Sequence, residues 1–189
     1  MTTQAYSLDA FVEDLRAVAS KTAKEAEILA QLRPLVLRAA LSKQWLKPHH
    51  YEALPEQGNG VHLLHEEPDH SWAVVAVSWL PGRQTPPHNH GTWAVVAGVD
   101  GPERNIFWKR VDDGTRSAYA ELEKIGERVV NVGDVLAMSA DTIHSIANDT
   151  DSVTLTLHVY GMHLNFSPRF QFDVEARSMT PRKTVWRDS

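Results

Sequence analysis

The sequence predicts a mostly β protein, a sandwich or barrel, with a helical segment in front of it. From about residue 58 onward, short runs rich in β-branched and aromatic residues follow one another, Pro-Gly and Asp-Gly pairs separate them, and no helical periodicity interrupts them. The length of 189 residues suits one domain with its own core. We expect a single domain over 1–189, with helices over 7–47, the β barrel over about 58–175 and a polar, loosely held tail over 176–189.

The N-terminal segment carries two helical patterns. In the first, apolar residues recur at three- and four-residue spacings, at Leu8, Phe11, Val12, Leu15 and Val18. Ser7 lies where a helix N-cap is expected, and Thr22 with Glu25 forms the capping-box pattern that begins a second helix. Pro34 lies inside that second pattern, so we expect it to kink or split the helix.

Several runs further along the chain have the length and composition of strands. Each is an alternating or continuous apolar run that ends at turn-forming residues. We expect strands near 72–80, 92–99, 104–111, 128–138, 143–147 and 153–161. Trp72, Trp79 and Trp93 lie in these runs and should belong to the core or the barrel wall.

The composition excludes several classes of function. The chain has no cysteine, so it can form no disulfide or thiolate metal site and has no cysteine nucleophile. A formal net charge of -5, without a Lys/Arg cluster, argues against a nucleic-acid partner. The first residues do not resemble a signal peptide, and no apolar run has the length of a membrane helix. We expect a soluble, cytoplasmic monomer or weak homo-oligomer with no membrane partner.

The stretch GRQTPPHNHGTW places two histidines one residue apart. In a strand, His88 and His90 point to the same face, which allows two imidazoles to bind one metal ion. Gly82 precedes this pair, with five residues between it and His88, and Gly101 follows. A lone His-x-His pair is weak evidence for a metal, so a third ligand has to come from elsewhere.

A second stretch, GDVLAMSADTIHSIAN, supplies that third candidate. His144 lies eleven positions after Gly133, and Asn148 lies four positions beyond His144. Together the two stretches resemble the two-part signature of the cupin superfamily, whose fold is a double-stranded β-helix, also called a jelly-roll barrel. The resemblance implies that His88, His90 and His144 are metal ligands on facing strands inside the barrel.

One departure from the cupin pattern is informative. Most cupins carry a glutamate ligand four or five residues after the second histidine, where this chain has Ala94 and Val95. The site would then hold three neutral imidazoles, with the charge of a divalent ion uncompensated and about three coordination positions open. Such a site suits anionic substrate ligands and catalysis. Three histidines also suit zinc, nickel and copper, so the ligands alone do not identify the metal.

The run VTLTLHVYG points to a narrower family. Its apolar residues alternate with Thr154, Thr156, His158 and Tyr160, so one face of the strand is polar. The Thr-x-His-x-Tyr series resembles the Ser-His-Tyr relay of the thiol dioxygenases, the cysteine dioxygenase branch of the cupins, which use three histidines on ferrous iron and lack the cupin glutamate. The resemblance covers about residues 50–175. It implies Fe²⁺ as cofactor and catalytic roles for Tyr160 beside the metal, for His158, which orients it, and for Thr156 in place of serine.

The expected substrate is a small thiol that carries a carboxylate. Mammalian-type cysteine dioxygenases crosslink their tyrosine to a cysteine, where this chain has Val95, and bind the substrate carboxylate with an arginine that stretch 61–72 lacks. Bacterial 3-mercaptopropionate dioxygenases instead use an arginine nine residues after the tyrosine, which is Arg169 here. We expect oxidation of a 3-mercaptopropionate-like acid by O2 to the sulfinate. Cysteine and mercaptosuccinate are the other candidates.

Two other functions fit the same motifs. One is a metal-dependent cupin dioxygenase that cleaves a carbon–carbon bond, and the other is a non-catalytic cupin that binds a small acid. A requirement for a thiol would separate these readings. The histidines His49, His50, His65 and His70 are expected to be surface or structural residues. His62 receives no role, and His163 could line the mouth of the pocket or be structural.

Overall fold

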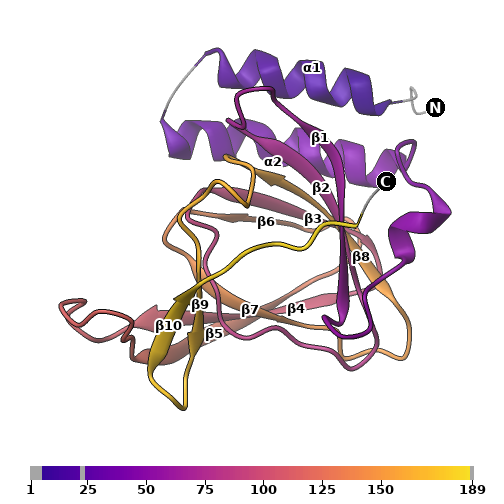
Figure 1. Ribbon diagram of the computed structural model, residues 1–189. Coiled ribbons are helices and arrows are strands. Elements are labelled where there is room, and N and C mark those ends of the chain that lie inside the picture. The colour runs from indigo at the N-terminus through magenta and orange to yellow at the C-terminus, as the bar shows by residue number, and fades with distance from the viewer. Residues whose placement is uncertain (1–5, 22–23, 188–189) are drawn as a thin grey trace.

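The computed structural model describes residues 6–21 and 24–187 and shows two facing β sheets, with a pair of helices stacked on one of them (Figure 1). The predicted mostly β fold with N-terminal helices is confirmed. The helices are α1 (Leu8–Ala19), α2 (Glu25–Ser42) and the short 3-10 helix η1 (Pro48–Tyr51). The strands are β1 (Asn59–Glu66), β2 (Ala73–Trp79), β3 (Ala94–Asp100), β4 (Glu103–Arg110), β5 (Leu122–Val130), β6 (Val135–Met138), β7 (Ile143–Ala147), β8 (Thr154–Tyr160), β9 (Phe170–Asp173) and β10 (Ser178–Pro181).

The strands wind back and forth between the two sheets. The larger sheet has the order β1-β2-β8-β3-β6, the smaller one has the order β5-β4-β7, and β9 and β10 form a separate hairpin. All of these pairings are antiparallel. Strand β8 lies between β2 and β3, although it follows them by more than fifty residues. Strands that are far apart in sequence are therefore neighbours, as in the double-stranded β-helix that the motifs predict.

The two long helices cover the outer face of the larger sheet (Figure 1). The Ser7 hydroxyl accepts a 3.2 Å hydrogen bond from the amide of Ala10, so the predicted N-cap of α1 is confirmed. Helix α2 continues through Pro34 to Ser42, so the proline does not split it. Burial of the α2 face against the sheet outweighs the one backbone hydrogen bond that a proline removes. The predicted capping residue Thr22 lies outside the described residues, within which no helix is long and apolar enough to cross a membrane.

Strand β8 separates the two sides of the larger sheet. Leu155, Leu157 and Val159 pack with the helices in the outer core. The alternate residues Thr156, His158 and Tyr160 are also buried and lie on the opposite side, toward the smaller sheet. The polar face that the sequence predicts is therefore the inner wall of the barrel, and its side chains are buried.

Two expectations about the strands need correction. The predicted run 128–138 is two strands, because a turn at 131–134 ends β5 before β6 begins. In this turn Gly133 has a φ of 89°, which glycine adopts without strain, and Asp134 accepts from the amide of Asn131. Strands β1, β9 and β10 were not expected. Strands β9 and β10 have only four residues each, and β1 has an irregularity between Leu63 and His65 that interrupts its alternation, so the periodic signal is weak. Pairing with neighbouring chain segments holds these strands in place.

The predicted loose tail over 176–189 is wrong for its described part. Residues 178–181 form β10, and the following segment crosses the open end of the barrel between the two sheets (Figure 1). The amide of Arg182 donates to the carbonyl of Arg169 at 3.0 Å, and that of Arg187 donates to the carbonyl of Val61 at 2.9 Å. Trp186 packs against the inner core. These contacts compensate for the polar composition, and they make the C-terminal segment part of the pocket wall.

Candidate metal centre

The first and third predicted ligands lie directly opposite each other. The amide of His88 donates to the carbonyl of His144 at 2.8 Å, and the amide of His144 donates back to the carbonyl of His88 at 2.9 Å. Residues paired in this way in an antiparallel arrangement project their side chains to the same face. His90, two residues further along, projects to that face as well. His88 and His90 lie in the connection between β2 and β3 and not in a strand, and the isolated bridge from His88 to His144 in β7 brings the three imidazoles together.

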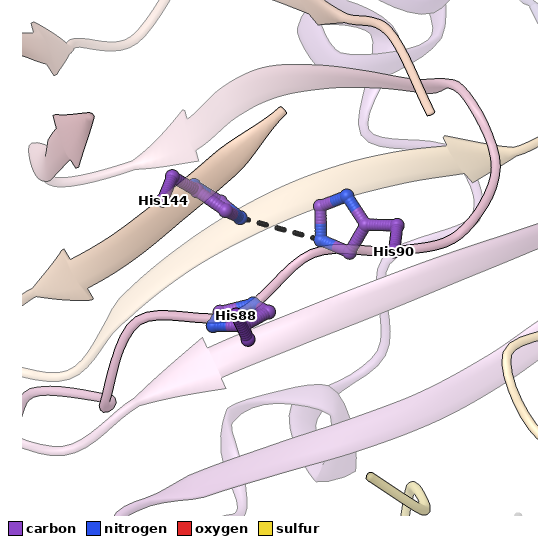
Figure 2. Close-up of side chains that lie close together, drawn as sticks. All are labelled: His88, His90 and His144. Carbon is purple, nitrogen blue, oxygen red and sulfur yellow. Dashed lines mark hydrogen bonds between the residues drawn. The ribbon is translucent and has the colours of Figure 1, made fainter. Parts of the chain in front are cut away.

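The three rings form a compact, buried cluster (Figure 2). One nitrogen of each of His88, His90 and His144 lies within 4.8 Å of those of the other two. The Nε2 atoms of His90 and His144 are 3.3 Å apart. With metal–nitrogen bonds of about 2.0–2.1 Å, two ligands of one ion lie about 3 Å apart, so this spacing suits a shared metal ion. We conclude that the cluster has the donor set and the size of a three-histidine metal site.

Hydrogen bonds fix the tautomers of two of these histidines. Nδ1 of His144 lies 2.8 Å from Oδ1 of Asn105, and Nδ1 of His88 lies 3.1 Å from the carbonyl oxygen of Pro86. Both partners are acceptors, so each Nδ1 carries the proton and each Nε2 keeps its lone pair for a metal. Nδ1 of His90 is buried and has no hydrogen-bonding partner among the described residues.

The environment keeps all three imidazoles neutral. Burial lowers the pKa of His88 and of His90 well below the ordinary value, and it lowers the pKa of His144 to about 3. The positive charges of Arg169 and Arg182 act in the same direction on each of them. Neutral imidazole is the form that binds metal ions, so these ligands do not need to lose protons at neutral pH.

The polar residues of β8 form one hydrogen-bonded series. The Tyr160 hydroxyl lies 2.8 Å from Nδ1 of His158, and Nε2 of His158 lies 2.7 Å from Oγ1 of Thr156. The ring of Tyr160 packs edge-on against that of His90, with 5.0 Å between the ring centroids. Burial lowers the pKa of His158 to about 3 and raises the pKa of Tyr160, so both groups are neutral. The tyrosine that the resemblance assigns to the relay thus adjoins the histidine cluster.

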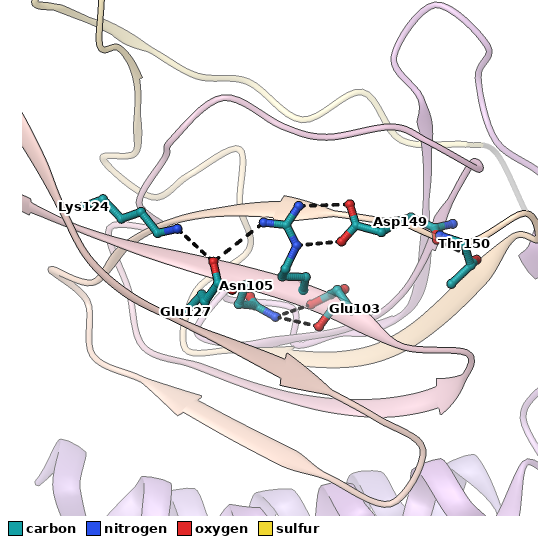
Figure 3. Close-up of polar contacts among 8 residues, drawn as sticks. Glu103, Asn105, Lys124, Glu127, Asp149 and Thr150 are labelled. Carbon is teal, nitrogen blue, oxygen red and sulfur yellow. Dashed lines mark hydrogen bonds and ion pairs between the residues drawn. The ribbon is translucent and has the colours of Figure 1, made fainter.

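Two residues that the sequence reading missed extend this series. Oγ1 of Thr156 donates to Glu103 at 2.9 Å. The side-chain amide of Asn105 also donates to Glu103, at 3.0 Å, as Figure 3 shows. Because Asn105 also contacts His144, a buried hydrogen-bonded path joins His144 to Tyr160 through β4. Burial raises the pKa of Glu103. The only sequence signal was the two-residue spacing of polar side chains at the start of that strand.

Arg169 reaches the pocket that the resemblance predicts for it. The pocket has a volume of about 490 Å³, including the part open to solvent, and His88, His90, His158 and Tyr160 contribute to its lining. Arg169 is 5% exposed, and its Nη1 donates to Oγ1 of Thr184 at 2.6 Å, while its Nε is buried without a described partner. Arg182, which sequence reasoning missed, lines the same pocket. No sequence pattern marks it, because the folding back of the C-terminal segment brings it there.

The other histidines lie outside this pocket lining. His62 and His50 are buried near η1, where Nε2 of His62 contacts the carbonyl of Glu52 at 2.9 Å and Nδ1 of His50 accepts from the amide of Lys47. His65 pairs with Glu67, and His70 stacks on Phe166. His163 stacks on Trp186 with 4.6 Å between the ring centroids, so its position favours the structural reading.

Comparison with known proteins finds distant structural similarity. No model of a known protein family matches the chain. An oxalate oxidase in complex with the substrate analogue glycolate is 17% identical, with a TM-score of 0.44 over 59% of this chain and 56% of that one. A double-stranded β-helix protein from Klebsiella pneumoniae is 12% identical, with a TM-score of 0.48. The match covers 67% of this chain and 88% of that one. A cupin superfamily protein from Desulfitobacterium hafniense is 19% identical, with a TM-score of 0.41. That match covers 59% of this chain and 84% of the other. The chain thus spans little more than half of the oxalate oxidase, and similarity at this level assigns no activity.

Proposed function

We propose that this protein is a ferrous-iron-dependent thiol dioxygenase that oxidises a small mercaptocarboxylate with O2 to the sulfinate. The observation that carries the proposal is the pocket itself. Two histidines of the three-histidine cluster, a buried tyrosine and a buried guanidinium line one small cavity. The broader conclusion, a metal-dependent enzyme with a cupin-like barrel, rests on the histidine cluster alone.

The donor set of the site fits the proposed metal. Three neutral imidazoles suit ferrous iron as well as other first-row metals, and no described carboxylate belongs to the cluster. A bound ferrous ion would supply the redox chemistry with O2 and would stabilise the substrate sulfur as a thiolate. The protein supplies neutral ligands, a binding surface for the rest of the substrate, and hydrogen bonds.

The proposed reaction is R–SH + O2 → R–SO2⁻ + H⁺. Both oxygen atoms form bonds to sulfur, sulfur is oxidised by four electrons and O2 is reduced by four, so no further reductant is needed. Arg169 would bind the substrate carboxylate, because a guanidinium fork matches the two oxygens of that group. Tyr160 would hold or donate a proton beside the reacting sulfur, with His158 orienting it. Val61, Val77 and Leu164 line the remaining wall and restrict the access of water.

The charges of the pocket favour an acid over an amino acid. Arg169, Arg182 and Lys183 all line it, and its described lining contains no aspartate or glutamate. The ammonium group of cysteine would therefore meet three positive charges and no carboxylate. A mercaptocarboxylate without an amino group avoids this repulsion. These charges support the 3-mercaptopropionate-like substrate over cysteine.

The decisive experiment is oxygen consumption by the iron-loaded protein with a panel of thiols. We expect turnover with 3-mercaptopropionate, little with cysteamine, and one sulfinate formed for each O2 consumed. Turnover of a diketone or aromatic acid without any thiol would instead support the carbon–carbon-cleaving alternative. Iron binding without oxygen consumption for any substrate would support the non-catalytic alternative.

A further inference from the structure

A second cation faces the pocket from the C-terminal segment. Arg182 follows β10, and its backbone amide donates to the carbonyl of Arg169 at 3.0 Å, so the two arginines are anchored to each other through the main chain. Both side chains line the cavity that contains His88, His90 and Tyr160. Nη1 of Arg182 and Nε of Arg169 are each buried without a hydrogen-bonding partner among the described residues.

The charges of these two guanidiniums are not compensated by the protein. Within residues 6–21 and 24–187, neither Arg169 nor Arg182 forms an ion pair, although the exposed Arg177 and the partly exposed Arg187 both do. Burial and, to a smaller extent, the charge of Arg182 together lower the pKa of Arg169 to about 10. A cation held away from water without a counter-charge is unfavourable, and Arg169 is buried while the Nη1 atom of the partly exposed Arg182 is buried too. Two such groups in one cavity indicate that a bound group supplies the missing negative charge.

We propose that Arg182 binds a second carboxylate and that the physiological substrate class is a thiol dicarboxylic acid such as mercaptosuccinate, with one carboxylate on Arg169 and the other on Arg182. This inference rests on the proposed function, since it places the thiol at the histidine cluster. Each arginine has its own unpartnered N–H group, which favours two anion positions over one. Two negative charges also neutralise the mutual repulsion of the guanidiniums more completely than one.

The first test measures binding without chemistry. The full chain, as purified and without oxygen, is titrated calorimetrically with succinate and with butyrate, which has the same carbon chain and one carboxylate fewer. We expect succinate to bind at least about tenfold more tightly, the scale of one additional charge pair in a partly open site. Arg182→Gln should remove this preference and leave butyrate affinity within about threefold, while Arg182→Lys, which keeps the charge, should retain part of it.

Arg177→Gln is the matched control. It removes the same charge from an exposed arginine that pairs with Glu121 and does not line the pocket. The preference for succinate should survive in this variant. Equal losses in Arg182→Gln and Arg177→Gln would show a general charge effect and overturn the proposal. Loss of butyrate and succinate binding together in Arg182→Gln would show that both arginines hold one carboxylate, which also overturns it.

The second test separates this proposal from the dioxygenase assignment. With iron-loaded protein, kcat/KM for mercaptosuccinate should exceed that for 3-mercaptopropionate, and Arg182→Gln should lower the ratio by about tenfold or more. A ratio that does not change in Arg182→Gln would contradict the proposal. Succinate binding that depends on Arg182, in a protein that oxidises no thiol, would retain the dicarboxylate site and reject the proposed function.

Discussion

The hydroxyl of Thr156 donates a 2.9 Å hydrogen bond to Oε2 of Glu103, a side chain with no exposed surface. A hydroxyl has one proton, so a Thr156 that donates to Glu103 can only accept from Nε2–H of His158. His158 then has an unprotonated Nδ1, which accepts the proton of the Tyr160 hydroxyl. With Glu103 ionised, every proton in this series therefore points away from the pocket.

A protonated Glu103 allows the opposite direction. Its carboxyl group can donate to Thr156, Thr156 then donates to His158, and Nδ1–H of His158 donates to Tyr160, whose own proton is free for a group in the pocket. Burial raises the pKa of Glu103, while hydrogen bonds from Asn105 and Thr156 lower it. Because the net shift of its pKa is upward, Glu103 stays neutral at pH values above the ordinary carboxyl pKa. It ionises as the pH rises through its own raised pKa.

Glu103→Gln should keep the series pointing toward the pocket at every pH, because the amide NH2 group donates to Thr156 while the amide oxygen accepts from Asn105. We expect wild-type kcat for 3-mercaptopropionate to decline as pH rises through the pKa of Glu103. The variant should lack this decline. The measurement is the pH profile of kcat, with iron content determined in parallel. The same profile in both proteins would mean that Glu103 does not control the direction of these hydrogen bonds.

His144→Ala should abolish metal binding, because it removes one of three neutral ligands from a buried site. We expect about one metal ion per wild-type chain and almost none in the variant, measured by elemental analysis after dialysis. His62→Ala is the matched control, since His62 is also buried but contacts a backbone carbonyl far from the cluster. Full metal loading of His144→Ala would reject the ligand assignment.

Tyr160→Phe should retain metal and substrate binding but lower kcat by about 10²- to 10⁴-fold, the range for losing a positioned proton donor. The variant removes only the hydroxyl that contacts His158 and keeps the ring that packs against His90. Steady-state kinetics with 3-mercaptopropionate measures the effect. An unchanged kcat would show that this hydroxyl has no part in the reaction.

Arg169→Ala should lower kcat/KM for 3-mercaptopropionate by the equivalent of about 2–5 kcal/mol, the usual scale for removing one partner of a desolvated charge pair. The residual activity toward cysteamine, which has no carboxylate, should change little. Arg177→Ala serves as control, because Arg177 is exposed and pairs with Glu121. Equal losses for the two thiols would indicate that Arg169, through its bond to Thr184, is structural.

Acid should destabilise the metal-free protein. The pKa of His144 and that of His158 are about 3 in the folded state and about 6.5 in the unfolded state. Below pH 6.5 the unfolded chain therefore binds more protons, so stability is complete above that pH and is lost as pH falls toward 3. Each group should lower the free energy of unfolding by roughly 1 kcal/mol per pH unit in this window. Urea unfolding at about pH 7 and about pH 5.5 tests this, and His158→Asn should show a smaller difference.

The sequence by itself determined the faces on which the chemistry lies. The spacing of His88 and His90 and the alternation from Thr154 to Tyr160 require only the two-residue period of an extended chain, which is a local property. The periodic spacing of apolar residues also predicted most strands and the helical segment. An element that buries one face places apolar residues at its own structural period, two residues in a strand and about 3.6 in a helix. The roles of Thr156, His158, Tyr160 and Arg169, the identity of the metal and the thiol substrate came from resemblance and stay predictions.

Only the tertiary structure decided which distant segments share the site. The isolated bridge between His88 and His144 joins segments separated by more than fifty residues, and no local pattern specifies that partner. Glu103 has only the two-residue spacing with Asn105 to mark it, and Arg182 looks like an ordinary surface charge in the sequence. The burial of Glu103 follows from the closing of the barrel around β4, and the return of the C-terminal segment across its open end brings Arg182 to the pocket. Those positions depend on long-range packing, in which many side chains from distant segments are buried together. A single sequence shows the periodicity of each segment but not which segments pack against one another.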